Sequence, residues 1–110
     1  MGLISFLAAL RTANRIEELS RRIAHKCRES VQQRLAAATT QMSFSETVGY
    51  VRARATGVVH QQVELALATE HTLPARARKE LLRRTSSQVV EHVVHDLYRQ
   101  RDRQAERKAG

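Results

Sequence analysis

The stretch ANRIEELSRRIAHKCRESVQQRLAAA, residues 13–38, decides the fold. Its apolar residues recur every three or four positions, the spacing that gathers side chains on one face of an α-helix. They are Ile16, Leu19, Ile23, Cys27, Val31, Leu35 and Ala38. Charged and polar residues occupy most other positions. We therefore predict a two-faced helix from about residue 3 to Thr39–Thr40, with this face turned to a core.

A second helix is predicted to begin at Ser43. Ser43 and Glu46 have the spacing of a capping box, in which each side chain accepts a hydrogen bond from the other residue's backbone N–H. This helix continues to about Thr69. Its main apolar face is Val48, Val51, Ala55, Val58, Val59 and Ala66, and another side carries the small residues Ser45, Gly49, Ala53 and Gly57. Small residues let a neighbouring helix approach closely. Because this segment carries two such faces and is the least charged of the three, we expect it to be the most buried helix.

The third helix is predicted to follow a turn at His71–Pro74. Thr72 has the residue type of an N-cap, and proline is well tolerated in a first helical turn. The helix runs to about residue 100 or beyond. Its predicted apolar stripe is Leu82, Val89, Val90, Val93, Val94 and Leu97.

Composition agrees with an all-α fold. The 110 residues include one proline and four glycines, and strong helix formers dominate. Short loops make neighbouring helices antiparallel. We therefore predict one domain, 1–110, built as an elongated antiparallel three-helix bundle of helical hairpins, open to completion by oligomerisation.

Helix lengths predict an overhang at each end. Folded back from Ser43, the second helix reaches only to about residue 15 of the first. Residues 1–14 then project as an apolar overhang, 15–100 form the body, and 101–110 form a basic tail that frays. Apolar surface that a small protein leaves uncovered needs a partner. We predict docking to a protein or a second copy, or to a membrane surface, through Leu3, Phe6, Leu7 and Leu10.

The net charge of +8 indicates a second kind of surface. Residues 72–110 carry ten basic and five acidic groups, for a net charge of +5. Arginine suits bidentate contacts with phosphate or carboxylate groups. The candidates for binding an anionic partner, nucleic acid included, are Arg76, Arg78, Lys79, Arg83, Arg84, Arg101, Arg103 and Arg107. Interleaved acidic residues favour the alternative of a solvated, self-paired face.

No pattern predicts catalysis, a cofactor, a metal site or a small-molecule substrate. Cys27 lies on the apolar face, where a thiol behaves as a small hydrophobic group. His92 and His95, with Glu91 and Asp96, combine metal-ligand residue types. A helical di-metal carboxylate site needs Glu-x-x-His motifs from two helices, and the sequence supplies none.

The single cysteine fits a reducing compartment, so we expect an intracellular, cytoplasmic protein. The acid-free, arginine-containing start through Arg15 also resembles a mitochondrial presequence, which keeps organellar targeting as an alternative. The functional hypothesis is a non-enzymatic interaction or assembly module. The alternatives are a basic accessory protein that binds DNA or RNA without sequence specificity, and a peripheral membrane protein held by the N-terminal amphipathic helix.

Overall fold

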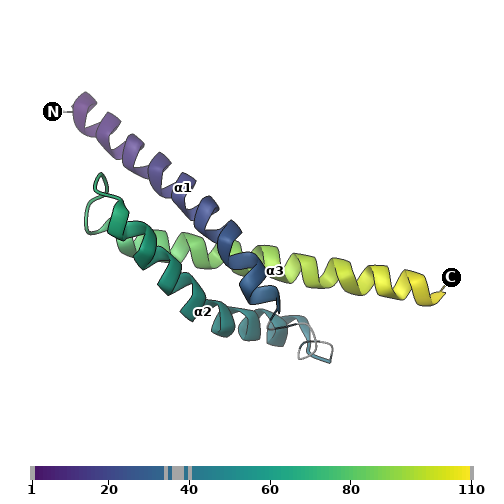
Figure 1. Cartoon of the computed structure of the whole chain (residues 1–110). Helices are drawn as coiled ribbons and strands as arrows, with labels where there is room; N and C mark the ends of the chain where they lie inside the picture. The colour runs from purple at the N-terminus through teal and green to yellow at the C-terminus, as the bar shows by residue number, and fades with distance from the viewer. Residues whose placement is uncertain (1, 34, 36–38, 40, 110) are drawn as a thin grey trace.

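A computed structural model describes residues 2–33, 35, 39 and 41–109. It contains three helices, α1 (Gly2–Gln33), α2 (Phe44–Thr69) and α3 (Ala77–Ala109). They form an elongated body of 63 × 25 × 21 Å. Consecutive helices run in opposite directions, so α1 and α3 point the same way (Figure 1). The predicted all-α three-helix bundle is confirmed.

Three polar contacts fix the register between α1 and α3. Glu17 accepts a hydrogen bond from Arg84, Ser20 from Gln88, and Asp96 from Arg28. The paired residues are 67, 68 and 68 positions apart, so the two helices advance in step. Extended in both directions, this register places the first residue of α3, Ala77, opposite α1 at about residue 10.

The middle helix keeps antiparallel registers with both neighbours. Arg15 of α1 pairs with Glu70, and the Cys27 thiol lies against the carbonyl of Val58. From the first contact to the second, the chain advances twelve residues along α1 and goes back twelve residues along α2. Against α3, Arg78 pairs with Glu64 and the Tyr98 ring contacts the Phe44 ring at 5.7 Å between centroids. From the first of these two pairs to the second, equally many residues separate the partners on α3 and on α2, in opposite directions along the chain.

The core follows from these registers. Ile16, Leu19, Ile23, Cys27, Val31 and Leu35 are buried, as the sequence predicted, and Ala38 lies outside the described residues. The structure differs from the predicted core mainly at residues that the predicted apolar faces did not include. Val63, Ala77 and Leu81 belong to the core, whereas Leu82 is half-buried at its edge.

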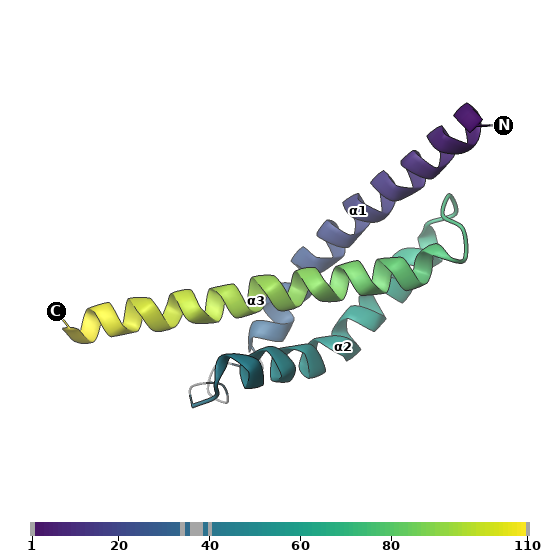
Figure 2. The same ribbon diagram turned by 180° about the vertical axis from the view of Figure 1, so that it is seen from behind.

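The most central helix is α3, which packs against both others more extensively than they pack against each other. Figure 2 shows it crossing in front of α1 and α2. The prediction that α2 is the most buried is therefore wrong. Its small residues Ser45, Gly49, Ala53 and Gly57 are exposed, and a Cβ added at either glycine would meet open space. A close helix crossing would have filled that space.

The helix ends test the capping and boundary predictions made from the sequence. The Glu46 N–H donates to Ser43 Oγ at 3.2 Å and the Ser43 N–H donates to Glu46 Oε1 at 3.3 Å, which confirms the capping box. The Thr72 cap is wrong, because its hydroxyl donates to the Glu70 carboxylate and α3 begins only at Ala77. The first helix ends at Gln33 rather than Thr39–Thr40. The prediction had continued this helix past Gln33, and residues 34, 36–38 and 40 of that continuation lie outside the described residues.

One buried hydroxyl gives a test of this packing. Thr85 Oγ1 is buried and has no hydrogen-bond partner among the described residues. Thr47 is equally buried, but its hydroxyl donates to the Ser43 carbonyl at 2.9 Å. An unpaired buried hydroxyl costs about 1–3 kcal/mol. We expect Thr85→Val to raise the free energy of unfolding by about 1 kcal/mol and Thr47→Val to lower it, measured by urea unfolding. Equal destabilisation by both substitutions would contradict the unpaired assignment.

Candidate functional site

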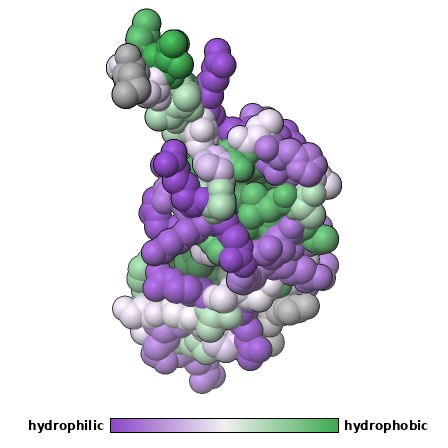
Figure 3. Space-filling model, turned by 90° about the vertical axis from the view of Figure 1, so that its left-hand side faces the viewer, coloured by the Kyte–Doolittle hydropathy of each residue, from purple (hydrophilic) through white to green (hydrophobic). Residues whose placement is uncertain are grey.

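The N-terminal end of α1 presents uncovered apolar side chains. We define the overhang as residues 2–14, the part of α1 that precedes its contacts with the body. By the α1–α3 register, its residues before about residue 10 extend past the start of α3. Its five large apolar side chains are exposed: Leu3 by 72%, Ile4 by 81%, Phe6 by 62%, Leu7 by 43% and Leu10 by 45%. Figure 3 shows it as an apolar projection above a largely hydrophilic body.

The body begins directly after the overhang. The Arg15 guanidinium lies 2.6 Å from the Glu70 carboxylate in the turn between α2 and α3, and Ile16 is the first buried residue of α1. The pKa of Glu70 is held below its ordinary value by a hydrogen bond from the Thr72 hydroxyl and by Arg15. This ionised carboxylate ties α1 to the turn at the point where the overhang starts.

A groove between α2 and α3 combines a few apolar residues with polar and charged ones. It has a volume of about 800 Å³, and every residue that lines it belongs to α2 or α3. Its apolar part consists of Val90 and Val94, which are buried, and of half-buried Val48, and Phe44, 62% exposed, stands at one end. The sequence predicted Val48, Val90 and Val94 as core. It gave no sign that these side chains border an open groove, because that depends on where α1 packs.

The basic cluster at the start of α3 is largely neutralised within the chain. Arg78 pairs with Glu64, and Arg83 and Arg84 both pair with Glu80, at 2.6 and 2.7 Å. Arg84 also reaches Glu17 of α1 at 2.6 Å. Two residues of this candidate set, Arg76 and Lys79, are exposed and have no ion pair within the described part of the chain.

The basic residues near the C-terminus divide into two groups. Arg101 is half-buried, where it donates to the Thr39 carbonyl and lies 5.0 Å from the centre of the Tyr98 ring. Arg103 and Arg107 are exposed and extend with α3 past the end of α1. α3 stays helical to Ala109, where the sequence predicted fraying from residue 101.

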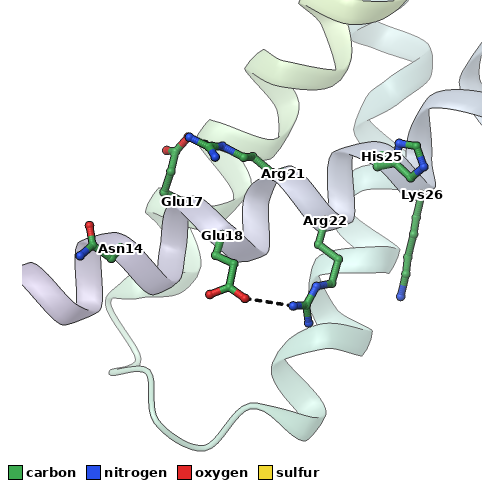
Figure 4. Close-up of a pocket in the computed structure, with 7 residues that line it drawn as sticks. All are labelled: Asn14, Glu17, Glu18, Arg21, Arg22, His25 and Lys26. Carbon is green, nitrogen blue, oxygen red and sulfur yellow. Dashed lines mark hydrogen bonds and ion pairs between the residues drawn. The ribbon is translucent and has the colours of Figure 1, made fainter.

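Little in the structure provides groups for chemistry. The Cys27 thiol is buried, and burial raises its pKa, which disfavours the reactive thiolate. A shallow hollow on α1 is lined from Asn14 to Lys26 by side chains of one helix (Figure 4). Its Arg21 and Arg22 pair with glutamates one turn earlier. Across the described residues, no group of three or more His, Cys, Asp or Glu side chains is placed to hold a metal ion.

Comparisons with protein-family models, with characterised proteins and with solved structures found no match to this chain. Within the described ranges, none of the helices is long and apolar enough to cross a bilayer.

The Glu80 cluster gives a pH prediction. Hydrogen bonds from Arg83 and Arg84 lower the pKa of Glu80 from 4.5 to about 2. Because the pKa is lower in the folded state, ionised Glu80 stabilises the fold above pH 4.5, and this contribution is lost as the pH falls towards 2. We expect Glu80→Gln to be less stable than wild type near neutral pH, with a difference that shrinks as the pH falls through this range.

Urea unfolding across this pH range measures that difference. Glu91→Gln is the matched control, since Glu91 is exposed on the same helix and forms no ion pair with the described residues. A wild-type–E80Q difference that stays constant with pH would show that the arginines contribute nothing through the charge of Glu80.

Proposed function

We propose that this protein is a non-enzymatic helical interaction module that docks onto another protein through its overhang. The observation that carries the proposal is the exposure of five large apolar side chains on one helical end that the rest of the chain is too short to cover. Burying each such side chain gains about 1.5–3 kcal/mol. A partner that covers several of them therefore gains enough free energy for specific association.

The chemistry of the overhang favours a protein partner over a lipid surface. A helix that lies in a membrane interface needs a strongly polar face opposite its apolar one. From Leu3 to Leu10, Ser5 is the single polar side chain, and Arg11 is the single charge of residues 2–14. A helix apolar on most sides is instead suited to burial between other helices.

Site-specific photo-crosslinking tests this proposal. A benzoylphenylalanine placed at Phe6 should give discrete protein adducts when the full chain is produced in its native cells. The control position is Leu65, which is 59% exposed against 62% for Phe6 and lies on α2 outside the groove. We expect adducts at position 6 and none of comparable yield at position 65.

Two results would contradict the proposal. Equal adduct patterns at both positions would show that exposure alone, rather than docking, determines crosslinking. Adducts to lipid at position 6 would assign the overhang to a membrane surface.

A second candidate function is binding to nucleic acid without sequence specificity. It is supported by Arg103, Arg107 and Lys108, which are exposed on the projecting end of α3 and have no ion pair among the described residues. Phosphate contacts of this kind supply affinity by releasing counterions, so binding weakens steeply with salt.

Matched charge removal tests the second candidate. We expect duplex DNA affinity to fall by about tenfold or more between ~50 and ~200 mM salt. Substituting Arg103, Arg107 and Lys108 with glutamine should weaken binding at low salt. The control substitutes Arg22, Arg78 and Arg83, which remove the same charge but are already paired with glutamates. Equal losses from both variants in a fluorescence-anisotropy titration would show a response to net charge without a site.

A further inference from the structure

We propose that the projecting end of α3 enters the major groove of double-stranded DNA and contacts base edges there. This inference rests on the second candidate function, because it names the nucleic acid and gives its binding a sequence preference. The segment concerned is residues 102–109, which continue α3 beyond the rest of the body. Figure 2 shows this end of α3 reaching past both other helices.

The length and width of this helix end match the groove. The α1–α3 register of 68 residues puts Gln33, the last residue of α1, level with Arg101. Phe44, the first residue of α2, meets Tyr98. The eight residue steps from Arg101 to Ala109 therefore project by about 12 Å. A helix with its side chains is about 10–12 Å across. The major groove of B-DNA is about 12 Å wide and about 8.5 Å deep, so a helix end of this size reaches the base edges.

Basic and acidic side chains divide between two halves of this helix. At about 100° per residue, one half holds four basic residues and two glutamines, which are Arg99, Gln100, Arg103, Gln104, Arg107 and Lys108. All six are exposed, and none forms an ion pair with another described residue. Asp102 and Glu106 lie on the other half. Asp96, one turn before Arg99, is neutralised by Arg28 of α1. This half therefore presents a continuous positive surface to a polyanion.

Positions around the helix give each side chain a role. Gln104 and Arg107 lie at the centre of the basic half, which faces the base edges when the helix is in the groove. Arginine makes paired hydrogen bonds with guanine O6 and N7, and glutamine does so with adenine N6 and N7. Arg103 and Lys108 lie on the two flanks, about 140° apart, where they face phosphates. Arg107 and Lys108 also offset the negative end of the helix dipole, which phosphates would otherwise meet.

Other anionic partners suit this segment less well. Proteins bind single strands by stacking bases on aromatic side chains, and residues 99–109 contain none. The major groove of A-form RNA is too narrow for side chains to read. Protein interfaces and membrane surfaces bury apolar side chains, and Ala105 is the one apolar residue of 102–108. Duplex DNA is therefore the polyanion that this helix end fits in both charge and shape.

Base analogues test where the helix binds. Selection by the full-length protein from a random duplex library should enrich a short sequence that contains guanine and adenine. That duplex is then titrated by fluorescence anisotropy at ~50 mM salt. Replacing its guanines with 7-deazaguanine removes the N7 acceptor from the major groove, and we expect binding about tenfold weaker. The control replaces them with inosine, which removes the 2-amino group from the minor groove and should leave the affinity unchanged.

Two single substitutions that remove the same charge test the roles of the side chains. Arg107→Ala should lower the affinity for the selected duplex about tenfold more than the affinity for random duplexes, because a base contact is lost. Arg103→Ala should weaken binding to both by a similar factor, because phosphates are alike in every sequence. Both side chains are exposed, so neither change disturbs the core, and circular dichroism checks the helix content.

The outcomes separate this inference from the second candidate function. Selection that enriches no sequence, or equal binding to the 7-deazaguanine duplex, would overturn contact with the major groove but leave binding without sequence specificity intact. Equal affinity for an RNA duplex of the selected sequence would do the same. If no duplex binds at low salt, both the inference and the second candidate function are wrong. Docking through the overhang is independent of all these results.

Discussion

The rest of the structure depends on the parallel register between α1 and α3. Three polar contacts, Glu17–Arg84, Ser20–Gln88 and Arg28–Asp96, hold the two helices in step. Each couples a turn of α1 to a turn of α3 beside the buried apolar stripe. A shift of one helical turn would break all three and would misalign the buried Cys27 and Val31 with their neighbours. Because the register is fixed, so are the points at which each helix outruns the others.

Much of this architecture was predictable from the sequence because it follows from periodicity and length. The apolar stripe of residues 16–35 and the Ser43–Glu46 capping box are local signals, and both predictions hold in the structure. The predictions that failed depend on which helices lie beside a given residue, which the local sequence does not show. Leu81 and Leu82 are adjacent and equally apolar, and only the placement of α1 and α2 decides that Leu81 is buried. The same holds for Gly49 and Gly57, whose spacing permits a close helix crossing that none of the three described helices makes.

Charge was the least predictable property. The sequence shows a cluster of arginines early in α3, but the pairing of Arg84 with Glu17 joins residues 67 positions apart. Such a contact leaves no local signature. The cluster therefore has a structural role. Arg78, Arg83 and Arg84 are paired with glutamates of the same chain and are not free to bind an anionic partner. Surface ion pairs are individually weak. Two of these pairs, Arg78–Glu64 and Arg84–Glu17, join separate helices, so together they favour one register over its alternatives.

The overhang and the groove have one common origin. Three helices of 32, 26 and 33 residues cannot cover one another completely when the shortest lies in the middle of the chain. The two long helices then project at opposite ends, and the face of α2 and α3 turned away from α1 stays open. If the chain functioned alone, polar residues in place of Leu3, Phe6 and Leu7 would form the same helix without exposing apolar surface. Their presence on a segment that the fold leaves bare is the physical reason to expect a partner there.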